Sequence, residues 1–327
     1  MKVEIEPEAG GAIPHHAMKK SLRLFMESYG LFMIFLLMFF VMIVFSESFR
    51  NPRNLVNLLQ QVSINGVIAC GMTLMLISGG IDLSVGATAA MSSMVAAELF
   101  LVMGIPFGVG GAILASLLAG FCNGLLIAKA KINAFVTTLG MSYILRGILY
   151  VSTNAGPIYA INSGFTKFGL GYTGPLPNIT GIFFLVAVIT HIVLRYTPYG
   201  QHLLSTGGNE EASRLSGINV DRVKIITYSI GGLLAGIGGL IILGQTGIAQ
   251  PTHATGYELN AIAAAVVGGT PLTGGQGKII NTVLGVLLLG LIQNAQNLLN
   301  IQPYWQPVIT GAIIVIAVGL DTQGKRS

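Results

Sequence analysis

Charge is what this sequence has least of. Asp, Glu, Lys and Arg make up 9% of the 327 residues and hydrophobic residues 53%, whereas soluble domains carry about 25% charged residues. So few charges cannot cover a surface in water, which excludes a soluble globular protein and indicates a lipid bilayer as the solvent. The net charge of +5 comes from basic residues at the ends of apolar runs. We therefore attribute it to orientation in a membrane rather than to nucleic-acid binding.

Cysteine and long polar stretches are scarce as well. Cys70 and Cys122 both lie inside apolar runs, so we expect buried thiols and neither a disulfide framework nor a metal site. No loop is long enough for a hydrophobic core of its own, which excludes a separate soluble domain. The sequence also lacks Gly-x-x-x-x-Gly-Lys-(Ser/Thr), so its glycine clusters do not indicate a nucleotide site and we expect no bound cofactor.

What the sequence does have is apolar runs. They lie at 29–45, 56–79, 84–103, 106–129, 134–151, 178–196, 223–245, 258–270, 279–297 and 304–320. The predicted fold class is therefore an all-α membrane protein with about ten transmembrane helices. The first run is filled by Phe, Met and Leu and has no cleavage pattern of a signal peptide, so we expect a retained span. The run 258–270 is the weakest, because it is short and need not cross fully.

Ten spans would place both termini on one side of the membrane, and the basic residues indicate which side. With the termini inside, only four of the 17 Lys and Arg lie outside or toward the outer face: Arg50, Arg53, Arg146 and Lys167. This asymmetry favours cytoplasmic termini. We expect a cytoplasmic tail at 1–28, a membrane domain at 29–321 with a polar inward loop at 197–222, and a second cytoplasmic tail at 322–327.

One charged residue lies among glycines between two apolar runs, in "SGGIDLSVGA" (78–87). Here Gly79, Gly80 and Gly86 flank Asp82 and Ser84. A charge at the bilayer centre costs at least about 2.5–3.5 kcal/mol, so Asp82 is not expected to face lipid. We favour a structural role, in which Asp82 or Ser84 caps the helix that starts near residue 84. A direct role in a transport path is the alternative.

A related pattern returns in "GGTPLTGG" (268–275). Both segments read Gly-Gly-x-x-Leu-(Ser/Thr)-x-Gly, with Gly268 and Gly269 at the start of the second. Glycine permits breaks in a helix and close backbone approach. We interpret the pair as traces of a weak internal repeat, which is common in transporters.

The inward loop contains "GGNEEASRLSGI", which has the signals of a short helix. Asn209 is a good N-cap, Glu210 and Glu211 suit the first turn, and Gly217 suits the position after the end. A helix of two turns is marginal alone in water, so we expect it to dock on something. A helix packed on its own bundle is the alternative.

Five stretches in order resemble the membrane subunit of ribose-type ABC sugar importers, over roughly 50–321. They are "GMTLMLISGGIDLSVGA" (71–87), "KINAFVTTLGM" (131–141), "GGNEEASRLSGINV" (207–220), "GYELNAIAAAVVGGT" (256–270) and "GAIIVIAVGLD" (311–321). Asn133 or Ala134 stands where that family usually has Pro, and Pro271 where it has Ser, which concerns local backbone only.

The resemblance implies the function and the partners. It implies a pore-forming subunit in a bacterial inner membrane, working with a second permease copy, a cytoplasmic ATPase and a periplasmic sugar-binding protein. ATP would bind the ATPase. The short helix at 208–218 would be the contact with that ATPase, through these residues: Asn209, Glu210, Glu211, Ser213, Arg214, Leu215, Ser216 and Gly217.

Polar residues within the spans are the candidates for the sugar path, because a sugar needs hydrogen-bonding partners. They are Asn65, Thr73, Thr137, Thr138, Asn260, Gln293, Asn294 and Asn297. For each, a hydrogen bond between helices is the alternative, worth about 0.6 kcal/mol on average in membranes. The amides at 293–297 stand out, because three on adjacent turns exceed what packing requires.

Other functions are less favoured by the sequence. A permease of the same family for a nucleoside or an amino acid is the nearest alternative. An ion-coupled transporter would need an ionisable group near the midplane, for which only Asp82 offers itself. An intramembrane enzyme would need a nucleophile beside a base, and neither His191 nor Asp321 is joined to one.

Overall fold

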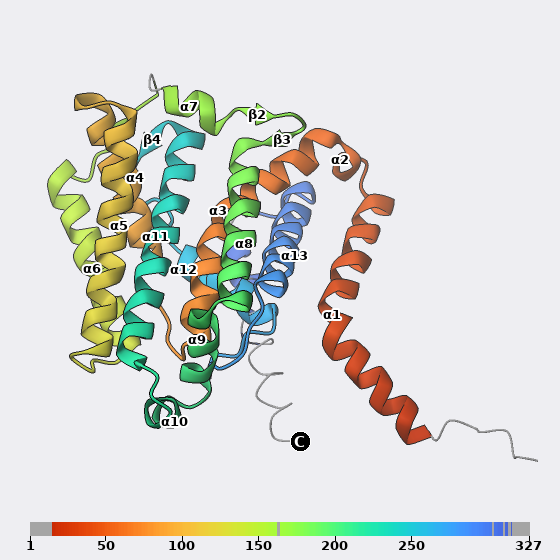
Figure 1. Cartoon of the computed structure of the whole chain (residues 1–327). Coiled ribbons are helices and arrows are strands. Elements are labelled where there is room, and N and C mark those ends of the chain that lie inside the picture. The colour runs from red at the N-terminus through yellow and green to blue at the C-terminus, as the bar shows by residue number, and fades with distance from the viewer. Residues whose placement is uncertain (1–14, 162–163, 303, 310, 313–314, 316–327) are drawn as a thin grey trace, which may run out of the picture.

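The computed structural model describes residues 15–161, 164–302, 304–309, 311, 312 and 315. These residues form a helical bundle (Figure 1). The helices are α1 (His15–Phe45), α2 (Glu47–Arg50), α3 (Pro52–Ile77), α4 (Val85–Val102), α5 (Ile105–Ala128), α6 (Ala134–Thr153), α7 (Gly164–Gly169), α8 (Asn178–Tyr196), α9 (Pro198–Gly208), α10 (Glu210–Leu215), α11 (Val220–Thr246), α12 (Tyr257–Val267) and α13 (Ile279–Leu298). The predicted helical class is confirmed.

Four strands of two residues each supplement the helices, and the sequence had not indicated them. Ile158–Tyr159 (β1) pairs antiparallel with Ile248–Ala249 (β4), and Tyr172–Thr173 (β2) pairs with Leu176–Pro177 (β3). They lie with α2 and α7 at one end of the bundle, which we name the α7 end (Figure 1). The opposite end, with α9 and α10, is named the α10 end.

Several helix boundaries follow from capping residues. Asn51 accepts a hydrogen bond from the Arg53 amide ahead of α3, with Pro52 in the first turn, and Asn133 accepts one from Phe135 ahead of α6. Asn219 does the same for Arg222 at the start of α11, and Gly247, at φ 69°, ends that helix. Side chains that replace the missing backbone partners, and a glycine in the left-handed region, are what fix these ends.

Seven helices of the described part are long and apolar enough to cross a membrane: α3, α4, α5, α6, α8, α11 and α13. The apolar part of α1, Gly30–Phe45, and α12 are shorter. Of the tenth predicted span, 304–320, most residues lie outside the described part. Ten spans therefore stay a prediction. α1 begins at His15, so half of the predicted polar tail is helical, and it runs beside the bundle from the α10 end to the α7 end (Figure 1).

The weak eighth span turns out to be a half-length helix. α12 has 11 residues, which cover about 16 Å of a hydrocarbon core about 30 Å thick. The chain nevertheless passes from one end of the bundle to the other, because residues 250–256 lead in from β4 and residues 268–278 lead out. The Gly275 amide bonds the Ile77 carbonyl at the end of α3, at 2.9 Å.

α11 is the central helix, packed against α3, α4 and α5. Its glycines lie at these contacts: a Cβ built at Gly232 would come within 2.9 Å of the Gly120 Cα on α5. Gly239 likewise packs on Ala89 of α4, and Gly231 on α3. The spacing of small residues along α11 is therefore a helix-packing feature, because lipid supplies no hydrophobic drive between helices and close van der Waals contact holds them together instead.

Candidate functional site

The short helix α10 projects at the α10 end between α9 and α11 (Figure 1). Asn209 is its N-cap and accepts a hydrogen bond from the Ala212 amide at 2.8 Å. Gly217 lies just after its end at φ 84°, and the Ile218 amide bonds back to the Ser213 carbonyl. The capping predictions for this helix are confirmed. Leu215 is 85% exposed, so the apolar side of α10 does not pack on its own bundle.

Ion pairs hold α10 to the bundle. Arg214 pairs with Glu210 at 3.0 Å and with Asp221 at 2.5 Å, and Glu210 also pairs with Lys224 of α11. Asp221 also pairs with Lys129 and Lys131, which lie in the α5–α6 connection. Four basic and two acidic side chains thus meet in a network that ties α10 to α5 and α11. Ser213 is buried, whereas Glu211 and Ser216 are exposed and take no part in the network.

The network shifts the ionisation of the α10 side chains. Burial alone would raise the pKa of Glu210, but hydrogen bonds from Lys224 and Arg214 outweigh it and leave the pKa below its ordinary value. The pKa of Arg214 is raised, because Asp221 and Glu210 accept hydrogen bonds from it. Both groups therefore stay charged across the physiological range, so α10 presents fixed charges around an exposed leucine.

Asp82 is buried, 1% exposed, in the turn between α3 and α4. Its Oδ1 accepts hydrogen bonds from the Ser84 amide at 2.7 Å and from the Ser84 hydroxyl at 2.6 Å. Asn123 of α5 donates to Asp82 Oδ2 at 3.4 Å and to Ser84 at 2.9 Å. Ser84 is the N-cap residue of α4 but makes no side-chain cap bond. The carboxylate thus holds the turn ahead of α4, which is a structural role. The predicted cap itself is not made, because neither Asp82 nor Ser84 accepts a side-chain bond from an amide of α4.

The glycines of the two related segments either adopt a positive φ or allow close packing. Gly79, at φ 80°, follows the end of α3, and Gly80 has no room for a Cβ because the Tyr228 hydroxyl lies against it. Gly268 packs on the α13 backbone at Asn281, and Gly269, at φ 81°, follows the end of α12. The two segments also touch, since a Cβ at Gly274 would come within 2.9 Å of Gly79. The internal repeat itself stays a prediction.

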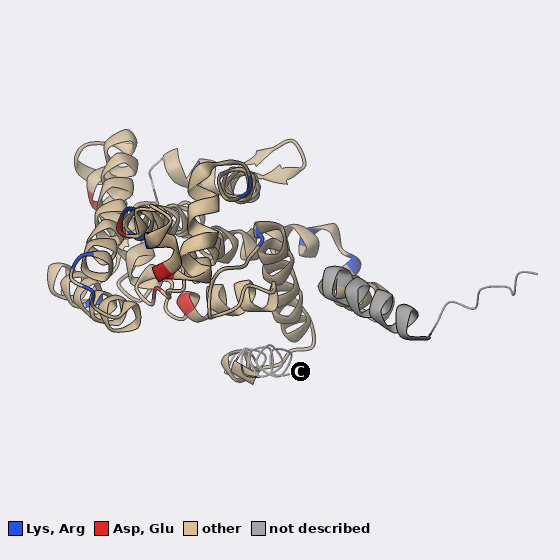
Figure 2. Cartoon of the chain, turned by 60° about the horizontal axis from the view of Figure 1, so that its bottom comes forward, with Lys and Arg blue, Asp and Glu red and all other residues tan. Residues whose placement is uncertain are grey.

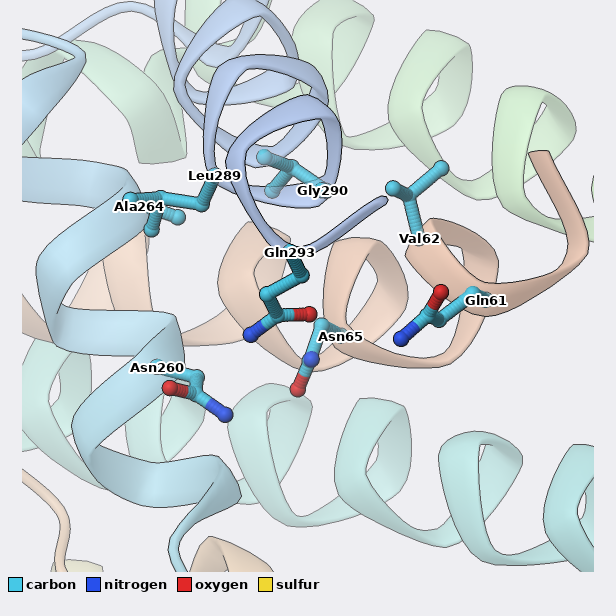
Figure 3. Close-up of a pocket in the computed structure, with 9 residues that line it drawn as sticks. Gln61, Val62, Asn65, Asn260, Ala264, Leu289, Gly290 and Gln293 are labelled. Atoms are coloured by element: carbon cyan, nitrogen blue, oxygen red, sulfur yellow. The ribbon is translucent and has the colours of Figure 1, made fainter. Parts of the chain in front are cut away.

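Three of the predicted path residues converge on one crevice. Asn65 of α3, Asn260 of α12 and Gln293 of α13 line it, and their amides are directed toward a shared space (Figure 3). Val62, Ala264, Val286, Leu289 and Gly290 supply its apolar walls. The Asn65 Oδ1 is buried without a hydrogen-bond partner among the described residues. Amides offer donors and acceptors without a charge, which suits hydroxyl groups that have to be released again.

A fourth amide at the crevice, Gln61, was missed from the sequence. It lies four residues before Asn65, so the two share one face of α3, and that spacing could have revealed it. The free space is about 10 Å³, which is about the room of one water molecule. The crevice is therefore closed to a larger solute in this conformation.

The remaining predicted path residues lie elsewhere. Thr73 bonds Thr282 of α13 at 2.7 Å, and Asn294 exchanges two hydrogen bonds with Asn54 of α3. Thr138 accepts a hydrogen bond from the Leu83 amide at 3.1 Å and so steadies the Asp82 turn. These three contacts tie helices or turns together. Asn294 is therefore a packing residue, although its neighbour Gln293 reaches the crevice.

Two more predicted residues also lie away from the crevice. Asn297 is exposed near the α7 end and accepts a hydrogen bond from Gln306 at 2.8 Å. Thr137 is buried in α6, and its hydroxyl has no partner among the described residues. The predicted cluster at 293–297 is therefore divided by the helical turn, because adjacent positions face different neighbours.

Lys, Arg, Asp and Glu occupy only short stretches of the described chain (Figure 2). No group of three His, Cys, Asp or Glu that could hold a metal ion occurs in the part of the chain that the structure describes. A lipid-soluble bundle with a closed, uncharged polar crevice and an exposed charged helix at one end is the arrangement of a membrane transport subunit.

Comparison with known proteins identifies that subunit. The chain belongs to the family described as "Branched-chain amino acid transport system / permease component", whose model matches residues 54–318. It is therefore a transport subunit that acts as one component of a larger system, as the sequence predicted.

Its relatives are curated permeases. The chain is 43% identical over 307 residues to the ribose import permease protein RbsC of Bacillus subtilis, covering 90% of this chain and 93% of that one. It is 42% identical to RbsC of Escherichia coli K12, over 85% and 88% of the two chains. It is 38% identical to the L-arabinose transport system permease protein AraH of the same strain, over 92% of each. No solved structure matches the chain.

Proposed function

We propose that this chain is the membrane-spanning subunit of an ATP-driven importer for a monosaccharide such as ribose or arabinose. The observation that carries the proposal is the 42–43% identity, over 85–90% of this chain, to proteins named ribose import permeases. The crevice supports it, because Gln61, Asn65, Asn260 and Gln293 offer hydrogen bonds to hydroxyl groups but no charge for an ion.

α10 is the proposed contact with the ATPase. Its exposed Leu215 and the charged side chains around it resemble the anatomy of a small protein interface, with an apolar centre and a polar rim. The network with Lys224 and Asp221 would carry a push on α10 into α11 and α5, the most closely packed helices of the bundle. Seating on the ATPase would cover Leu215.

The orientation and the assembly follow from the same features. In the described part of the chain, most of the basic residues belong to the α10 end, so we propose that this end faces the cytoplasm and that the two terminal tails belong to the same side. A sugar-binding protein delivers the substrate at the α7 end, at the bacterial inner membrane. Since the crevice admits about one water, a monosaccharide requires α12 to move, or a path completed by a second copy of the chain. We propose a homodimer.

Reconstituted uptake tests this function. Proteoliposomes with the permease, its ATPase and its binding protein are expected to accumulate labelled ribose or arabinose when ATP is supplied. Uptake of a nucleoside or leucine in their place would indicate a permease of the same family with a different substrate. Uptake without the ATPase would overturn the proposal.

The coupling role is tested by Arg214→Glu with Leu215→Asp. We expect ATP-driven uptake to fall more than about tenfold while membrane insertion is kept, because the apolar contact is lost and charges are reversed. Lys278→Glu reverses a charge at the same end away from α10 and serves as the control. Co-purification of the ATPase with the double variant at wild-type yield would count against the assignment.

A further inference from the structure

Arg146 carries the only charge of α6 and is half-buried. A cation within a membrane helix is costly unless it finds partners. Its Nη1 donates to the His253 carbonyl oxygen at 2.9 Å and also to the Pro251 carbonyl oxygen. Both acceptors belong to residues 250–256, more than a hundred positions later in the chain.

Residues 250–256 form an irregular segment between β4 and α12. The polar groups of an irregular backbone need partners within the protein wherever water does not reach them. The segment is also unusual in conformation, with Ala254 at φ 54° and Gly256 at φ 84°. Such a backbone persists only where its surroundings hold it.

The segment is confined from a second side by α4. Gly86 lies so close that an added Cβ would collide with the Ala254 carbonyl oxygen and the Glu258 carboxylate. The other Glu258 oxygen accepts a hydrogen bond from the Gly256 amide at 3.2 Å. The segment is thus clamped between Arg146 of α6 and Gly86 of α4.

The clamped segment leads directly to the crevice. The backbone N–H of Asn260 donates to the Gly256 carbonyl oxygen at 3.1 Å, so Asn260 follows the last residue of the segment by one helical turn. Its side chain is directed into the crevice (Figure 3). A shift of residues 250–256 would therefore move the side-chain amide of Asn260 relative to the side-chain amides of Asn65 on α3 and Gln293 on α13.

We propose that Arg146 is a positioning residue for transport, which holds the Asn260 amide in the crevice by fixing residues 250–256 through two main-chain carbonyls. The inference rests on the proposed function in one respect, namely that Asn260 contacts the sugar. The Nη1 of Arg146 carries two N–H groups and donates to both carbonyls from one atom. A lysine ammonium has enough donors, but its shorter side chain would hold the nitrogen farther from both carbonyls.

A double-mutant cycle in the complete reconstituted importer tests the proposal, with labelled ribose and arabinose as the probes. Arg146→Met is expected to lower the uptake rate about tenfold or more, and Arg146→Lys about threefold, at unchanged membrane content. In an Asn260→Ala background, Arg146→Met should cost less than about twofold further, because the residue that it positions is already gone. Lys167→Met removes a charge at the α7 end and should transport as wild type.

The outcomes separate the inference from the function on which it rests. If the Arg146 and Asn260 losses multiply, Arg146 does not act through Asn260 and the inference is wrong. If Asn260→Ala transports normally while the wild-type complex imports sugar, the path role of Asn260 fails instead. Where Arg146→Met does not reach the membrane, Arg146→Lys completes the same cycle, and its full additivity with Asn260→Ala overturns the proposal.

Discussion

At the scale of the residue, the role of a buried polar group of the described chain depends on its hydrogen-bond partners. Asp82 is the clearest case, because three hydrogen bonds from Ser84 and Asn123 converge on it with no cation in contact. A carboxylate fully engaged in local hydrogen bonds is poorly placed to exchange an ion. The geometry therefore favours a turn-forming role over ion coupling.

Substitution of Asp82 separates the two roles. Asp82→Ala leaves the amide and the hydroxyl of Ser84 without their acceptor, at about 1–3 kcal/mol per buried group, so the melting temperature in detergent should fall. Asp82→Asn keeps an acceptor oxygen for Ser84 and is expected to lie between the alanine variant and wild type. A stable Asp82→Asn protein with abolished uptake would instead indicate that the carboxylate serves the transport path.

At the scale of the element, helices of this bundle approach one another through glycine. α5 and α11 meet at Gly120 and Gly232, where backbone faces backbone and no flexible side chain is available to yield. The half-length α12 is held in the same way, since Gly285 of α13 packs on the Ala264 carbonyl. Close approach replaces the hydrophobic drive that is missing between helices in lipid.

Gly232→Val tests this packing. The added atoms would collide with the Gly120 Cα and with the Ser116 carbonyl oxygen, and overpacking costs about 1–3 kcal/mol or more. We expect a lower melting temperature and reduced accumulation in the membrane. Gly140→Val on α6 is the matched control, because a Cβ there meets nothing within 4 Å. Equal loss in both variants would contradict a specific α5–α11 contact.

At the scale of the whole molecule, the two ends of the bundle differ in kind. The α10 end carries the charged network around α10, and the α7 end carries the two short strand pairs (Figure 1). A transport subunit needs such a difference, because one face receives the substrate and the other receives the driving force. The closed crevice lies between the two ends.

Thiol labelling tests which end faces the cytoplasm. Cys70 is buried as expected, but Cys122 is exposed, so the expectation of two buried thiols is wrong for Cys122. In a Cys122→Ser background, Leu215→Cys should react with an impermeant maleimide only in inverted vesicles. Lys167→Cys should react in intact spheroplasts. The reverse pattern would place α10 outside and remove the basis for its contact with a cytoplasmic ATPase.

The sequence determined the class of the protein and much of its local structure. Scarce charge and long apolar runs fixed a helical membrane protein, and the caps Asn209 and Gly217 fixed α10, because these effects act within a few residues of the chain. It also indicated Asn65, Asn260 and Gln293, although their convergence could not be read from it.

Only the tertiary structure showed the features that depend on contacts between residues far apart in the sequence. It showed α12 as a half-length helix, divided Gln293 from Asn294, added Gln61 to the crevice and joined Arg146 to the carbonyls of Pro251 and His253. The reason is physical: a polar side chain in lipid takes whichever partner the packed bundle brings within hydrogen-bonding distance. For Arg146 that partner lies more than a hundred residues later in the chain, so no local pattern records it.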